Sequence, residues 1–129
     1  MCSNTNSGIQ NAIKKSSIIF QGRVEKTLYV TPFVFLTKFN VEHYWKNNQQ
    51  ITTVIYVIGS ACIESCSFSF LEGHHYIVFG EIENGFYRAT TCMPSQELYS
   101  SDATQNIINV LNSTLGDPKP SRNAKVILK

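Results

Sequence analysis

The chain has 129 residues, 43% of them hydrophobic, and its 11 Lys and Arg against 9 Asp and Glu give a net charge of +2. This length suits one domain, because such a chain buries one sizeable core and is too short for two. With no basic run longer than Lys14-Lys15, the charge pattern excludes the footprint of a nucleic-acid binder and disfavours acidic membranes as partners. The chain also has no stretch of the roughly 18 apolar residues that a membrane-spanning helix needs.

The first three elements are predicted by changes in the period of the apolar residues. Helical spacing predicts an amphipathic helix from Ser7 to Ser16. β-Branched and aromatic residues then predict a long strand over 17–30, with a bulge at Gly22. Beyond Pro32, alternation over 33–42 predicts a second strand.

Three further strands are predicted, over 51–58, 76–82 and 86–92. The polar residues 46–50 indicate a hairpin loop before the third strand. The apolar run within that strand indicates that both of its faces are covered. Asn84-Gly85 predicts a tight turn between the last two strands.

A second helix, capped by Ser101 or Asp102 and stopped by Gly116, is predicted after the strands. Five antiparallel strands of this length close most economically into a small barrel, because closure removes exposed edges, and an up-and-down sandwich is the alternative. The predicted fold is therefore mainly β with a short helix near each end. Residues 1–116 are expected to form the domain and residues 117–129 a flexible tail.

The four cysteines indicate two disulfides and an oxidising compartment, because their number is even and no cofactor motif accompanies them. A bridge between Cys62 and Cys66 would close a very short loop and so add little stability. One of the two is therefore expected to pair with Cys2 and the other with Cys92. Cys2 directly after Met1 is typical of a first mature residue whose leader has been removed, or of a lipid anchor if that leader ended in a lipobox. The sequence therefore favours a secreted, periplasmic or cell-surface protein.

No metal, cofactor or catalytic centre is expected. His74 and His75 lie in the same loop as two cysteines, but the spacing is poor for zinc, and adjacent strand residues point to opposite faces. His43 is interpreted as a solvent-facing or half-buried strand residue. The sequence contains no catalytic triad, paired carboxylates or Gly-rich phosphate loop, so an enzyme is not expected.

Several short segments follow one another in a characteristic order. They are 17–24, Phe39-x-Val41 with Trp45-Lys46, the run 66–80 with its Cys66, Gly73 and Tyr76, and Thr90-Thr91-Cys92. Together they resemble the netrin-like domains and the tissue inhibitors of metalloproteinases, over most of the chain from Cys2 to about Leu115. The resemblance implies an OB-type five-stranded barrel with flanking helices, held by disulfides at one end.

The resemblance also implies a way of inhibiting zinc proteases. In the inhibitors, the N-terminal Cys is disulfide-linked to the loop before the fourth strand, here Cys2 to Cys66, and its α-amine and carbonyl chelate the zinc of the target. Ser3 would enter the specificity pocket. Flanking contacts are expected from Ser60, Ala61, Ser65, Cys66 and Ser67. Asn4 stands where the inhibitors have a second Cys, from which we infer that Cys92 pairs with Cys62.

Two functions are therefore expected of a single-domain, monomeric protein. One is inhibition or binding of a zinc metalloprotease through Cys2 and Ser3, which requires a free amine on Cys2. The alternative is a non-inhibitory extracellular module that binds a protein or a glycan, because a fold does not fix a function. The aromatic residues considered for its contact surface, although such residues more often pack inside, are Tyr44, Trp45, Phe86 and Tyr87.

Overall fold

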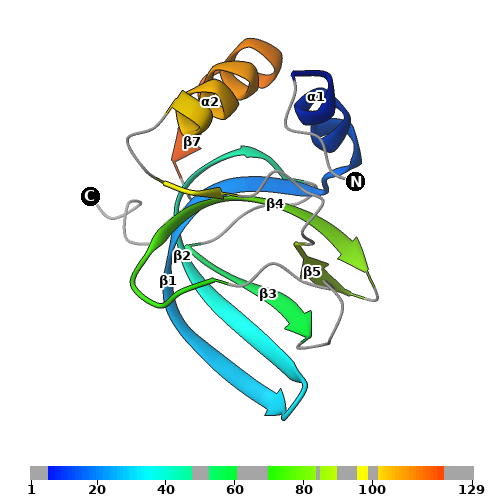
Figure 1. Ribbon diagram of the computed structural model, residues 1–129, viewed down its shortest axis with the longest axis vertical. Coiled ribbons are helices and arrows are strands. Elements are labelled where there is room, and N and C mark those ends of the chain that lie inside the picture. Colours follow the sequence, from blue (N-terminus) through cyan, green and yellow to red (C-terminus); the bar gives the residue numbers. More distant parts are fainter. Residues whose placement is uncertain are drawn as a thin grey trace, which may run out of the picture.

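A computed structural model describes residues 6–47, 53–60, 70–83, 85–89, 96–98 and 102–120 (Figure 1). The elements follow the order α1 (Asn6–Lys15), β1 (Ile18–Thr31), β2 (Val34–Lys46), β3 (Val54–Ser60), β4 (His75–Glu83), β5 (Phe86–Arg88), β6 (Gln96–Glu97), α2 (Asp102–Leu115) and β7 (Lys119–Pro120). The described part of the chain is thus mainly β, with one short helix before the strands and one after β6.

Five strands close into a barrel, which confirms the predicted fold class. β1 pairs with β2 along one edge and with β4 along the other, and the circuit continues through β3 and β5. The closed order β1-β2-β3-β5-β4 is that of an OB-type barrel. A closed ring with an odd number of strands cannot be antiparallel throughout. The exception is the β3–β5 pair, which is parallel and joins Val57 to Tyr87 and Ile58 to Arg88.

Two hydrophobic layers share the strands β1 and β4. Inside the barrel, Phe20 of β1 and Val78 of β4 are fully buried, and they pack with nine other buried residues, namely Ile18, Val24, Phe39, Val41, Ile55, Val57, Phe70, Tyr76 and Ala89. On the outer face of the same strands, Ile19 and Phe79 belong to the layer beneath the helices, which also contains Ile9, Ala12, Ile13, Trp45, Ile77, Ile107, Val110 and Leu111. This division follows from the period of two in a strand. Both helices lie at the same end of the molecule (Figure 1).

The strand β3 is covered on one face only. Ile55 and Val57 are buried, whereas Tyr56 between them exposes 40% of its surface. The prediction that this strand is covered on both faces is therefore wrong at Tyr56. The helices instead cover β1 and β4, which have buried residues on both faces, and the end of β2 at Trp45.

Glycines stand at several of the predicted breaks. The β1–β2 ladder shifts its register between Gln21 and Gly22, as the predicted bulge requires. Gly85 has a φ of 86° before β5, and Gly116 has a φ of 88° directly after α2. The Gly116 amide donates to the carbonyl of Asn112 at 2.9 Å, which satisfies one of the last carbonyls of that helix.

Other boundaries differ from the prediction. β2 continues to Lys46, because Lys46 still pairs with Ile19 of β1. In the segment predicted as a tail, Lys119 and Pro120 pair with Tyr44 and His43 of β2. Residues 121–129 lie outside the described part of the chain.

Candidate functional site

Of the residues predicted to contact a protease, Ser60 lies in the described part of the chain. It is the last residue of β3 and pairs with Val34, at the start of β2 beside the β1–β2 turn. The other predicted contacts, Cys2, Ser3, Asn4, Ala61, Ser65, Cys66 and Ser67, fall outside the described residues, as do Cys62 and Cys92. The zinc-chelating arrangement and both disulfide pairings therefore stay predictions.

The three histidines lie on two strands or next to them. His43 belongs to β2, His75 is the first residue of β4, and His74 precedes it. His75 Nδ1 lies 3.0 Å from Glu42 Oε2, and Glu42 Oε1 accepts a hydrogen bond from Gln21 Nε2 at 2.8 Å. His74, the residue before, is exposed. His43 is partly buried, and burial lowers the pKa of its imidazole. No group of three or more metal-ligating side chains occurs among the described residues.

The four aromatic residues considered for a contact surface have different surroundings. Trp45 is buried beneath α2, where its indole Nε1 donates to Asn112 Oδ1 at 2.8 Å. Tyr44 and Tyr87 are partly buried against the barrel interior. Phe86 exposes 48% of its surface at the start of β5. Three of the four thus contribute to packing, and only Phe86 is largely open to solvent.

The three most exposed of the large hydrophobic side chains in the described structure lie at the free end of the β1–β2 hairpin. This end projects away from the helices (Figure 1). Tyr29, Val30 and Phe33 expose 67%, 62% and 67% of their surface. We call this surface the hairpin end, and define it as Leu28, Tyr29, Val30, Phe33, Val34, Phe35, Leu36 and the neighbouring Ile58 of β3.

Both faces of the hairpin end are apolar. On one face the rings of Tyr29 and Phe35 are 5.7 Å apart, and Phe35 packs over Gly59, where a Cβ atom would lie 2.6 Å from the ring. On the other face Leu28 pairs with Leu36, and Leu36 pairs with Ile58. A hairpin with one face in water normally alternates apolar and polar residues. The hairpin end lacks that alternation.

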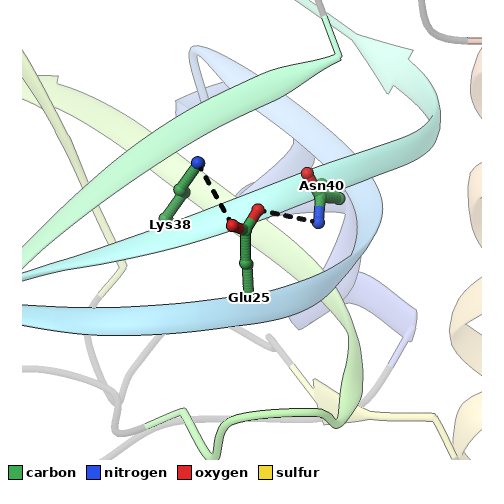
Figure 2. A network of polar contacts seen from close by, with 3 residues as sticks. All are labelled: Glu25, Lys38 and Asn40. Carbon is green, nitrogen blue, oxygen red and sulfur yellow. Dashed lines mark hydrogen bonds and ion pairs between the residues drawn. The ribbon is translucent and has the colours of Figure 1, made fainter.

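The hairpin end stops at a row of polar side chains that crosses three strands. Lys26 of β1 pairs with Lys38 of β2, and Lys38 pairs with Tyr56 of β3. Glu25 joins the row, since its carboxylate accepts from Lys38 Nζ at 3.3 Å and from Asn40 Nδ2 at 3.1 Å (Figure 2). The bonds from Asn40 and Lys38 lower the pKa of the exposed Glu25 carboxyl. We call Glu25, Lys26, Lys38, Asn40 and Tyr56 the polar belt.

The turn of the hairpin satisfies its own amide groups. Thr31 Oγ1 accepts hydrogen bonds from the amides of Phe33 and Val34, at 3.1 and 3.0 Å. Nearer the barrel, the amide of Thr27 donates to Glu72 Oε2 at 3.0 Å. The Thr31 side chain thus bonds the backbone of the turn, and both of these turn amides have a hydrogen-bond acceptor within the protein.

The sequence prediction did not identify the hairpin end. The signal is the segment 27–37, whose eleven residues include no charged side chain. Alternation over 33–42 predicts a strand, but the polar residues of its second set begin only at Lys38, since Val34 and Leu36 occupy the preceding positions of that set. Exposure of both faces depends on where the helices pack, which the local sequence does not specify.

Comparisons with known proteins give no family assignment: no protein-family model matches the chain, and no curated protein matches it. Neither α1 nor α2 in the described structure is long and apolar enough to cross a membrane.

Proposed function

We propose that the protein is a netrin-like binding module of an oxidising compartment that inhibits a zinc metalloprotease through Cys2 and Ser3. The observation that supports this proposal is the closed barrel order β1-β2-β3-β5-β4, because it is the OB-type architecture that the resemblance to the inhibitors implies. In the proposal, Ser60 at the end of β3 belongs to the surface that flanks Cys2.

In the proposed mechanism the protein inhibits by binding, and none of its groups catalyses a reaction. The neutral α-amine and the carbonyl of Cys2 chelate the target's zinc together. One of them takes the position of the catalytic water and the other makes the zinc five-coordinate, which catalytic zinc sites allow. A Cys2–Cys66 disulfide holds these two ligands in place before binding, so that less conformational entropy is lost in the complex. Ser3 then fills the pocket that selects substrate side chains.

The test compares preparations of the full chain that differ only at the N-terminus. One begins with a free Cys2, and the other keeps Met1 or is acetylated at Cys2. Each is titrated against a panel of zinc endopeptidases with a fluorogenic peptide substrate. Inhibition by the free form alone is expected, because only that form offers the amine. Equal inhibition by both forms, or by neither, contradicts the proposal.

A Cys66→Ser variant with a free Cys2 separates chelation from preorganisation. It keeps the amine and removes the disulfide, so weaker inhibition is expected at unchanged protease specificity. A Cys92→Ser variant is the matched control, because it removes the other proposed bridge and leaves the Cys2–Cys66 link in place. If Cys92→Ser weakens inhibition more than Cys66→Ser does, the proposed pairing is wrong.

The second candidate function is a module that binds a glycan or a protein without inhibiting it. It is favoured by the polar outer face of β1 and β2, where Glu25, Lys38 and Asn40 offer a carboxylate, an ammonium and an amide within one contact network (Figure 2). Glycan-array binding that is lost in Asn40→Ala and unaffected by acetylation of Cys2 is the result expected of this function. Binding that depends on the free amine contradicts it.

A further inference from the structure

We propose that the hairpin end inserts into the interfacial region of a lipid bilayer, so that this protein docks on membranes by the tip of its β1–β2 hairpin. The proposal does not depend on protease inhibition, since it uses other residues. It rests on the distribution of apolar and polar side chains along the hairpin and on the hydrogen bonds of its turn.

The first argument is that the hairpin end is apolar on all sides. Tyr29 and Phe35 lie on one face, Leu28 and Leu36 on the other, and Phe33 at the turn between them. A protein partner that docks on a flat patch covers one face, and its interface carries about one hydrogen bond per 100–200 Å². A bilayer surrounds a protruding tip and offers apolar surroundings to both faces together. The observed distribution therefore favours lipid over a single protein surface.

The second argument is the sharp boundary at the polar belt. Lys26, Lys38 and Tyr56 occupy paired positions on three adjacent strands, so they lie at one level of the sheet. Tyr and Lys are the side chains that mark membrane–water interfaces, because each combines an apolar stem with a polar end. Lys38 is four positions along β2 from its first residue, Val34, which is about 13 Å of strand. That length exceeds the depth of about 5–10 Å to which interfacial apolar surfaces are buried, so the turn can reach this depth while the polar belt stays outside the apolar region.

The third argument concerns the backbone at the turn. A buried amide without a partner is costly in an apolar medium. The amides of Phe33 and Val34 both donate to Thr31 Oγ1, so these two groups do not depend on water. The turn can thus leave water without losing those two bonds.

The charges near the hairpin end and on the whole chain indicate that binding does not require anionic lipids. Lys38 contacts Glu25, and the chain as a whole carries a net charge of only +2. Attraction to anionic lipid is therefore weak, and apolar contact supplies the main part of the binding. Vesicles of zwitterionic phosphatidylcholine are expected to bind the protein, with only a modest increase when phosphatidylserine is added.

The test measures co-sedimentation of the full, unacylated chain with phosphatidylcholine vesicles. Phe33→Ser is compared with Phe86→Ser, which removes a phenylalanine that is also exposed, by 48% against 67% for Phe33, from the β4–β5 hairpin. Phe33→Ser is expected to lower the partition coefficient at least about fivefold, whereas Phe86→Ser changes it less than about twofold. Equal losses in the two variants, or no partitioning of the unmodified chain, overturn the proposal. Circular dichroism checks that both variants remain folded.

A depth measurement distinguishes insertion from other uses of the same surface. Tyr29→Trp is expected to show a blue-shifted tryptophan emission and quenching by brominated phosphatidylcholine, while Tyr56→Trp in the polar belt is quenched less. The native Trp45 contributes the same background fluorescence in both variants. Self-association that is lost in Phe33→Ser without any vesicle binding would assign the hairpin end to a second copy of the chain. Tip-dependent binding to a protein in the absence of lipid binding would assign it to a protein partner.

Discussion

At Gly22 a Cβ atom would lie 2.9 Å from the backbone carbonyl oxygen of Asn40 and 3.3 Å from the ring of Phe20. The carbonyl belongs to the neighbouring strand and cannot turn aside, so any side chain forces the two strands apart. Gly22 therefore permits the close approach of β1 and β2 at the bulge where the barrel bends. Gly59 meets a different neighbour, since the three atoms nearest to a Cβ atom there all belong to the side chain of Phe35.

The variant Gly22→Ala is expected to lower the free energy of unfolding by about 1–3 kcal/mol, as other overpacked sites do. Gly59→Ala is expected to cost less, because the half-buried Phe35 ring can rotate towards solvent. Urea denaturation of the two variants and the parent chain measures both values. A larger loss for Gly59→Ala would show that the Phe35 ring is held more rigidly than the backbone of β2.

The burial of His43 makes stability depend on pH. Burial disfavours the imidazolium and lowers the pKa of this residue below its usual 6.5, while the charge of Glu42 acts in the opposite direction. Below pH 6.5 the unfolded chain takes up a proton at this position more readily than the folded chain. The contribution of His43 is therefore fully present above pH 6.5 and is lost as the pH falls through the folded-state pKa.

The variant His43→Gln removes this titration and is expected to flatten the fall in unfolding free energy as the pH is lowered from 7.5 to about 5. Urea unfolding at a series of pH values gives the slope for each chain. Parallel slopes for His43→Gln and the parent would contradict the assignment.

At the scale of elements, α2 packs on the barrel with its apolar side and accepts a hydrogen bond from Trp45 of β2. Leu111 is fully buried, and Val110 and Ile107 are nearly so. Asn112, the residue after Leu111, accepts the indole hydrogen bond of Trp45 at 2.8 Å. This bond joins the last turn of α2 to the end of β2.

Truncation of the buried side of α2 tests this attachment. Leu111→Ala is expected to cost about 2–5 kcal/mol of unfolding free energy, since it removes buried methyl groups and leaves a cavity. Asn109→Ala, at an exposed position of the same helix, is expected to stay within about 0.5 kcal/mol. Thermal and urea unfolding measure both. A small effect of Leu111→Ala would mean that the helix contributes little to the folded barrel.

The predicted elements agree with the structure where the apolar period was strong. Both helices and the five barrel strands lie close to their predicted places, because the side that packs determines the period. The end of β2 was missed, since Lys46 begins a polar run that resembles a loop. In the structure Lys46 pairs with Ile19, and its Nζ donates to the carbonyl of Ile13 near the end of α1 at 2.6 Å. That role depends on a contact between distant segments.

At the scale of the whole molecule, the two hydrophobic layers meet in β1 and β4. Phe20 of β1 pairs with Val78 of β4, and the backbone amides around this pair lie between the two layers. Among the described strands, the segment Leu28–Thr31 of β1 pairs with β2 alone, and it faces solvent. Resistance to local opening should therefore fall along β1 from the barrel to the turn.

Amide hydrogen exchange followed by NMR measures this gradient. The slowest exchange is expected in Ile18–Gly22 and Tyr76–Gly80, and much faster exchange in Leu28–Thr31. In the presence of phosphatidylcholine vesicles, exchange in Leu28–Thr31 should slow if the hairpin end inserts. Uniform protection along the whole of β1 would contradict the gradient.

The barrel was predictable from the number of strands, but two of its features were not. A parallel β3–β5 seam follows from closing five strands, yet the sequence carries no local sign of which pair is parallel. The hairpin end is not predicted from the sequence because Val34 and Leu36 are typical of a buried strand, whereas both helices pack at the opposite end of the molecule. The predicted site at Cys2 and Cys66 remains a prediction.

The alternation in β1 also determines where the chain tolerates changes of length. Ile18 and Phe20 point into the barrel, while Ile19 between them points towards the helices. Deleting one residue within this stretch would reverse the alternation beyond the deletion. Side chains that now point into the barrel would then point towards the helices, and those that point towards the helices would point into the barrel. Insertions and deletions that preserve the fold are therefore expected outside Ile18–Val24, so related chains of different length should align without gaps there.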